Sequence, residues 1–398
     1  MAHQALPTGC ALIGGSWSER DLENRLSPWS DPAVCPDLLV VLAATRTAEV
    51  PGISAAGSTP ESRRYTAIAD AELLLQGPAS QPCWPLPPLP AGVSPALISW
   101  VAVQCLGLRP HVAALGLAQQ PPFPHLRFEA PAFGAADCLS SGRAMDLSRV
   151  TQLWERGRRF GTGLRRPLVL AECVPGGTTT AQAVLRGLGM PVDAFVSGSA
   201  LNPPLGLKRR LVAEGLERAP VTQAMNPQAL IAAVGDPFQA LAAGVAVGAM
   251  QAGQPLMLAG GSQMLAVAAL ALNGVPRDDR AAMATSLLLG TTAWLADEQL
   301  GGHGAAFPQL LQTATAHLEV PLLALASGLR FHHSRHNQLQ AYEQGHVKEG
   351  VGAGGLALLT QLRGWGADPL QQQCDLAMDA LVQRGACPSP HGSLGSEP

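Results

Sequence analysis

Two glutamates in this sequence border glycine-rich turns, and both are candidates for proton transfer. Glu172 follows the apolar run 168–170 and precedes a Pro-Gly-Gly turn, whereas Glu349 directly precedes the glycine-rich run 350–355. A glutamate in an apolar pocket has a raised pKa, which suits it to accept a proton near neutral pH. The alternative for Glu349 is a first-turn residue that stabilises a helix through the helix dipole. Spacing alone leaves both interpretations open.

The stretch 168–188, LVLAECVPGGTTTAQAVLRGL, has the pattern of a strand, a tight turn and a helix. Gly176 and Gly177 allow positive φ angles and let an anion approach bare backbone N–H groups. Thr178 or Thr179 can cap the helix by accepting a hydrogen bond from a free N–H. A turn of this kind at a helix N-terminus predicts a phosphate site. The alternative is an ordinary loop between strand and helix with a threonine cap.

Two further glycine-rich turns adjoin predicted elements. Gly260, Gly261 and Ser262 follow an apolar run, and Gly350 and Gly352 precede a predicted helix that starts near residue 356. Ligands of open α/β sheets bind beyond the carboxyl ends of the strands. Turns that converge there suit a nucleotide-like ligand that carries a phosphate. None of the turns has the Gly-Lys-Ser/Thr ending of a P-loop or the dinucleotide-binding fingerprint.

These turns need a sheet to hold them, and the chain alternates strand-type and helix-type segments. Strands are predicted at 37–42, 111–117, 168–170, 192–196, 255–259, 286–289 and 321–326. Helices are predicted at 66–75, 94–105, 147–161, 181–188, 205–215, 226–233, 236–250 and from 264 onward. This alternation predicts an α/β fold, Rossmann-like in its layers, with a mainly parallel sheet and helices on both faces.

The predicted domain organisation has one large unit. Residues 1–36 are expected to be an irregular, proline-bearing segment, 37–385 the α/β domain, and 386–398 a disordered Pro/Ser/Gly tail. A small accessory region is expected to form from parts near both ends of the chain.

Composition excludes several classes of partner. Only 14% of the 398 residues are charged and the net charge is −3, which gives no basic field for nucleic acid or an anionic membrane. The apolar region 256–275 is interrupted by two glycines, a serine and a glutamine, and so predicts buried elements rather than a membrane span. The eight cysteines form no CxxC pair, and the first residues lack a signal-peptide pattern. We therefore expect a reduced, cytoplasmic protein.

A histidine cluster raises the question of a metal. His332 and His336 form an i, i+4 pair if 331–340 is helical, with His333 and His346 nearby. A metal site would need that helix and a further ligand. We expect no metal here and a polar loop beside the substrate instead.

The order and spacing of these motifs resemble the nicotinate-nucleotide:dimethylbenzimidazole phosphoribosyltransferases, most closely a divergent branch of that family. The likeness covers most of residues 37–365. Glu172-Cys-Val-Pro-Gly-Gly-Thr-Thr-Thr resembles the family's glutamate and Gly-Asn-Thr-Thr turn, with Gly177 in place of the asparagine. Lys208 is similar to a family lysine, and Lys348-Glu349-Gly-Val-Gly-Ala resembles the Gly-Glu-Gly-Thr-Gly-Ala motif. The segments 53–57 and 63–65 are similar to features of the divergent branch.

The resemblance implies transfer of the phosphoribosyl group of nicotinate mononucleotide to a flat bicyclic base, a benzimidazole or purine, for the lower ligand of a cobamide. It implies a homodimer that needs no cofactor or metal, with Glu349 as the catalytic base and Glu172 as an orienting group. The substrate-binding candidates are Glu172, Gly176, Gly177, Thr178, Thr179, Lys208, Gly260, Gly261, Ser262, Gly350 and Gly352. Two alternatives are a binding or regulatory module without turnover and a hydrolase of the mononucleotide. The acceptor pocket of the family is not recognisable in this sequence.

Overall fold

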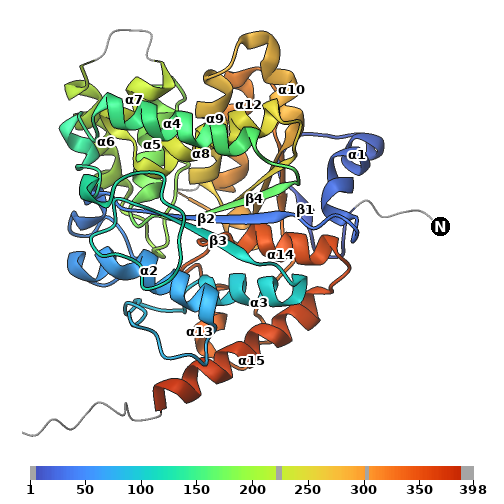
Figure 1. Ribbon diagram of the computed structural model, residues 1–398. Coiled ribbons are helices and arrows are strands. Elements are labelled where there is room, and N and C mark those ends of the chain that lie inside the picture. Colours follow the sequence, from blue (N-terminus) through green and yellow to red (C-terminus); the bar gives the residue numbers. More distant parts are fainter. Residues whose placement is uncertain (1–5, 221–225, 301–303, 387–398) are drawn as a thin grey trace, which may run out of the picture.

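A seven-stranded sheet lies at the centre of the computed structural model, which describes residues 6–220, 226–300 and 304–386 (Figure 1). The strand order is β1-β7-β6-β5-β4-β2-β3; β2 to β7 run parallel, and β1 pairs antiparallel with β7. The strands are β1 (Ala11–Leu12), β2 (Asp37–Ala43), β3 (Pro110–Leu115), β4 (Leu168–Cys173), β5 (Leu256–Ala259), β6 (Leu287–Thr291) and β7 (Leu323–Ala326).

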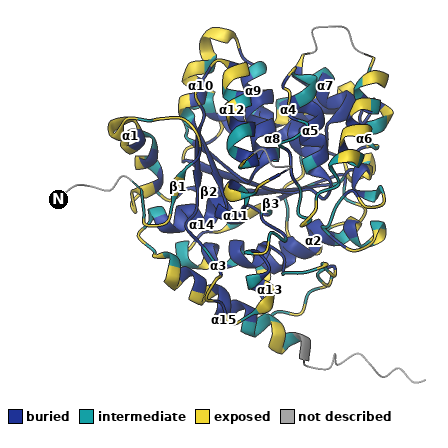
Figure 2. Cartoon of the chain, turned by 180° about the vertical axis from the view of Figure 1, so that it is seen from behind, coloured by how far each residue is buried: buried dark blue, intermediate teal, exposed yellow. Residues whose placement is uncertain are grey.

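Helices cover both faces of this sheet, which confirms the predicted fold class (Figures 1 and 2). The layer at the top of Figure 1 contains α4 (Leu147–Thr162), α5 (Gly177–Gly187), α6 (Leu205–Arg218), α7 (Pro227–Val234), α8 (Pro237–Gln251), α9 (Ser262–Asn273), α10 (Arg280–Ser286) and α12 (Ala306–Leu318). The opposite side contains α1 (Glu19–Ser30), α2 (Pro60–Gln76), α3 (Ala96–Leu106), α14 (Ala353–Leu362) and α15 (Ala367–Ala386). Shorter segments are α11 (Ala293–Asp297), α13 (Asn337–Gln340), η1 (Arg46–Glu49), η2 (Pro131–Phe133), η3 (Leu139–Ser141) and η4 (Arg277–Asp279).

The central strands are buried on both faces, as the continuous apolar runs in the sequence require. In β2, Leu39 and Val41 face the core under α4 to α9, and Val40 and Leu42 face the core under α2, α3 and α14. Figure 2 shows the resulting buried layers on both sides of the sheet. No helix in the described ranges combines the length and apolarity needed to cross a membrane.

Three local expectations are wrong. The segment before residue 37 is not irregular, because Ser18 caps α1 and Leu22, Leu26 and Trp29 bury one face of it. The segment 192–196 forms no strand, since β4 pairs directly with β5 and leaves no place between them. The first turn of α5 is not capped by a threonine: its N-cap is Gly176, with a φ of 80°. The predicted tail beyond Ala386 lies outside the described residues.

The helices α4 and α8 touch backbone to backbone through pairs of glycines. A Cβ on Gly157 would clash with the carbonyl oxygen of Leu241, and one on Gly248 with that of Arg158. Gly161 and Gly244 are equally crowded by the partner helix. Glycine is therefore required at this crossing, because no side chain fits between the two backbones.

We predict that Gly248→Ala lowers the free energy of unfolding by about 1–3 kcal/mol or more, because the added methyl group overpacks the crossing. The matched control is Gly206→Ala in α6, where a Cβ would meet nothing within 4 Å; it should leave stability unchanged or raise it by up to about 1 kcal/mol. Urea unfolding measures both. Equal effects of the two substitutions would contradict the role of the close approach.

Candidate active site

One cavity of about 640 Å³ opens at the carboxyl ends of the parallel strands, within the usual size of a small-molecule site. Its wall includes most of the predicted site residues: Glu172, Gly176, Gly177, Thr178, Lys208, Gly261, Ser262, Glu349 and Gly350. Three others lie behind this wall. Thr179 is fully buried in the first turn of α5, Gly352 packs against Ala171, and Gly260 has a φ of 152° at the end of β5.

The carboxylate of Glu349 is held by four donors. Its Oε2 accepts from Thr291 Oγ1 and Thr292 N, each at 2.9 Å. Its Oε1 accepts from Gly350 N at 3.0 Å and Gly354 N at 3.1 Å. Burial raises the pKa of Glu349, and these donors, which stabilise the charged form, act against that rise. The side chain stays partly exposed to the cavity.

Glu172 lies near Glu349 but has a less polar environment. Its Oε1 accepts from Gln263 Nε2 at 2.9 Å. Burial raises the pKa of Glu172 to about 8, and the charges of Asp236 and Glu349 act in the same direction. At neutral pH, therefore, Glu172 holds a proton while Glu349 has the donors that favour its anion.

Gln263, to which no sequence motif pointed, takes the space beside Gly177. A Cβ on Gly177 would overlap the Gln263 amide, so a side chain at this position would displace the end of Gln263. Where the family resemblance expects an asparagine at position 177, an amide from the first turn of α9 lies beside the turn. This amide reaches back to Glu172 across the ends of β4 and β5.

The segment that carries Glu349 has a strained backbone. Val347, Lys348 and Val351 all have φ between 53° and 64°, which L-residues and especially β-branched ones avoid. The segment is tied to its surroundings: Val351 N donates to Glu172 O at 3.0 Å, and Ser99 Oγ donates to Val351 O at 2.8 Å. These hydrogen bonds fix the position of the Glu349 segment relative to Glu172.

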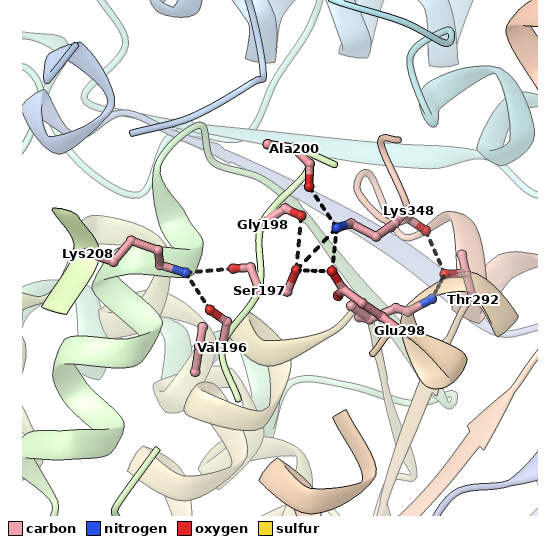
Figure 3. Close-up of polar contacts among 9 residues, drawn as sticks. Val196, Ser197, Gly198, Ala200, Lys208, Thr292, Glu298 and Lys348 are labelled. Carbon is pink, nitrogen blue, oxygen red and sulfur yellow. Dashed lines mark hydrogen bonds and ion pairs between the residues drawn. The ribbon is translucent and has the colours of Figure 1, made fainter. Parts of the chain in front are cut away.

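A polar cluster closes one side of the cavity (Figure 3). Lys348 Nζ donates to Glu298 Oε1 at 2.6 Å and to Ala200 O at 2.9 Å. Lys208 Nζ donates to the carbonyl oxygens of Val196 at 2.9 Å and Ser197 at 2.6 Å. Burial lowers the pKa of Lys208 to about 7, and the charge of Glu298 acts against that shift. These two hydrogen bonds hold the 196–200 loop in place. The sequence did not reveal this role of Lys208.

A second polar cluster lies on the side of α2 and α3. Asp70 accepts from Ser94 Oγ at 2.6 Å and from the Cys173 thiol at 3.3 Å, and all three residues line the cavity. Burial raises the pKa of Asp70 to about 6, against the effect of these two hydrogen bonds. No sequence motif pointed to this group, because its members come from segments far apart in the chain.

The histidines contact separate carboxylates rather than a shared point. α13 begins at Asn337, so His332 and His336 are not an i, i+4 pair on a helix. His332 contacts Glu343 at 3.3 Å, and His336 contacts Asp379 at 3.0 Å. Within the part of the chain that the structure describes, no group of three or more His, Cys, Asp or Glu residues could hold a metal ion.

Comparison with known proteins agrees with this architecture. A phosphoribosyltransferase family model matches residues 98–287. The structure of CobT from Thermus thermophilus aligns with a TM-score of 0.56 and 21% identity, over 92% of this chain and 91% of that one. A structure of nicotinate-nucleotide-dimethylbenzimidazole phosphoribosyltransferase from the same organism aligns with a TM-score of 0.55 and 20% identity, over 92% and 91%.

The two solved structures show a shared fold, and the family model matches slightly less than half of this chain. A UPF0284 protein of Parasynechococcus marenigrum (strain WH8102) is 57% identical over 95% of this chain and 96% of the relative. One of Prochlorococcus marinus (strain MIT 9313) is 55% identical over 95% and 94%. The chain belongs to the UPF0284 protein family.

We predict that Glu172→Gln makes the protein less sensitive to alkaline pH. A carboxyl whose pKa is raised on folding contributes most stability below its unfolded pKa of about 4.3, and this contribution is lost as pH rises through the folded value of about 8. The glutamine side chain does not titrate, so the variant does not lose this contribution. The difference in free energy of unfolding, variant minus wild type, should therefore increase by several kcal/mol from pH 5 to pH 9.

Urea unfolding at each pH measures this difference. Glu217→Gln, which changes an exposed glutamate of α6, is the control and should leave the pH profile unchanged. A constant difference between wild type and Glu172→Gln across the pH range would contradict the raised pKa.

Proposed function

We propose that this protein transfers the phosphoribosyl group of nicotinate mononucleotide to a flat bicyclic base, giving an α-linked nucleotide for the lower ligand of a cobamide. The observation that carries the proposal is the pair Glu172 and Glu349 in one cavity beside the N-termini of α5 and α9. The neighbours of similar fold include a nicotinate-nucleotide-dimethylbenzimidazole phosphoribosyltransferase.

The helix N-termini suit the phosphate. Gly176 and Gly177 begin α5 and Gly261 and Ser262 begin α9, and all four line the cavity. Backbone N–H groups and the helix dipole favour an anion at such a position, and a monophosphate needs no metal there. Lys208 supports this end by fixing the 196–200 loop rather than by reaching for the phosphate with a free ammonium group.

The carboxyl pair suits the substitution at C1′. A nitrogen of the acceptor base forms a bond to C1′ as the bond from C1′ to the pyridine nitrogen breaks. The bonding electrons return to the pyridine, which was cationic and leaves as nicotinate without a general acid. The attacking nitrogen carries no proton, and its bond to C1′ makes the base cationic. The remaining ring N–H of the base therefore becomes acidic, and Glu349 takes that proton. Protonated Glu172 limits the pair to one negative charge and orients the ribose or the turn.

The acceptor slot is expected to be aliphatic. Gly350 and Val351 beside Glu349 and the loop residues Leu86, Leu89 and Val93 line the cavity, and these side chains can sandwich a flat base. Apolar fit discriminates by only about 1–3 kcal/mol per missing group. More than one base is therefore expected to react, including dimethylbenzimidazole and adenine. The homodimer and the cytoplasmic location also stay predictions.

The test is incubation with nicotinate mononucleotide and each of a panel of benzimidazoles and purines, following nicotinate release and the α-linked product. We expect product with at least two bases. Binding of the mononucleotide without product from any base would replace the enzyme with a binding module. Nicotinate release without a new nucleotide would indicate a hydrolase.

We predict that Glu349→Gln lowers kcat by about 100-fold or more, because the amide cannot accept the proton. The amide nitrogen would also face the N–H donors that hold the carboxylate, so folding is checked by circular dichroism. Affinity for the mononucleotide should stay nearly unchanged in calorimetry, and the exposed control Glu23→Gln should match wild type. Near-normal turnover in folded Glu349→Gln would remove Glu349 from the role of base.

A further inference from the structure

Arg63 is a buried cation on the cavity wall that the reaction above does not use. It lies in the first turns of α2, and only 6% of its surface is exposed. Its Nε donates to Gly57 O at 2.9 Å, and its Nη1 donates to Ala48 O at 2.9 Å and Val50 O at 3.3 Å. The guanidinium is thereby fixed in one orientation.

The positive charge of Arg63 has no ion-pair partner in the described ranges. Among residues 6–220, 226–300 and 304–386, no carboxylate forms an ion pair with it, and its Nη2 makes no hydrogen bond. Its neighbour Arg64 pairs with Glu49 at 2.9 Å on the surface, and the equally buried Arg149 pairs with Glu129 at 2.7 Å. Burial of a charge is costly unless it is paired. The unused donor on the cavity wall therefore indicates a site for an anion.

The position of Arg63 indicates which anion. Arg63 is bonded to the segment after β2, whereas Glu349 is bonded to the segment after β6, with β4 and β5 between them. Three strand spacings amount to about 14 Å. The surrounding wall includes the apolar residues Ile53, Ala55 and Ala56, together with Ser54 and Ser58. This end of the cavity suits an aromatic ring that carries a negative group.

We propose that Arg63 binds the carboxylate of the pyridine ring of the nucleotide and so selects the acid over the amide. This inference rests on the proposed function, in which the helix N-termini hold the phosphate and the ring carboxylate is the remaining anion of the substrate. Arg63, Thr66 and Asp70 lie at i, i+3 and i+7 on one face of α2 and all line the cavity. A guanidinium is suited to a carboxylate because its planar donors match the two oxygens.

The test compares nicotinate mononucleotide with nicotinamide mononucleotide, which differ only in the ring carboxylate. Calorimetry with wild type should show tighter binding of the acid by about 10-fold or more. Arg63→Gln should lower the affinity for nicotinate mononucleotide by about 10- to 100-fold and leave the affinity for nicotinamide mononucleotide nearly unchanged. Arg64→Gln is the matched control, since it removes the adjacent, surface-paired arginine, and should keep the wild-type preference.

An equal loss of affinity for the acid and the amide would overturn the proposal, since it would mean that Arg63 only supports its loop or binds the phosphate. Nicotinate riboside separates these outcomes: a loss of affinity confined to the two phosphorylated ligands would assign Arg63 to the phosphate.

If Arg63→Gln does not fold, Arg63→Lys serves instead, and an unchanged acid-to-amide ratio of affinities in that variant overturns the proposal. If wild type binds neither nucleotide, the proposed function itself fails. If it turns over the acid without the predicted selectivity, only the Arg63 assignment fails.

Discussion

The four hydrogen bonds to the Glu349 carboxylate join the end of β6 to the start of α14, and the geometry of the cavity depends on that junction. The strained backbone around Glu349 persists because this carboxylate and the contacts of Val351 hold it in place. Strain of about 1–3 kcal/mol per residue is maintained only where the surroundings determine the conformation. The buried Glu349 carboxylate thus sets the position of its own loop and, through Val351, the position of that loop relative to Glu172.

Charge in the cavity follows an order along the edge of the sheet. Arg63 lies near the end of β2, Glu172 ends β4, and the Glu349 segment meets the end of β6, with helix N-termini beside them. In the proposed substrate, the ring carboxylate lies toward Arg63 and the phosphate toward the helix N-termini, so each anion faces a positive group. Electrostatic complementarity of this kind contributes to specificity more than to raw affinity.

The sequence was sufficient for features that depend on local chemistry. The helix predicted at 66–75 lies within α2, and the run from Leu168 to the threonines indicated β4, its turn and α5. It was not sufficient where the outcome depends on distant contacts. The segment 192–196 has strand character but lies outside the sheet, where β4 pairs directly with β5. The lysine at 208 was singled out, but its bonds to two carbonyl groups depend on the 196–200 loop. Likewise, the isolation of Arg63 depends on backbone oxygens from two loops.

The shared space of Gly177 and Gln263 links the size of residue 177 to the environment of Glu172. A Cβ at 177 would take the volume of the Gln263 amide, so a larger residue there displaces this amide and removes its hydrogen bond to Glu172. The size of residue 177 therefore acts on a carboxyl group that it does not touch, through the position of one amide.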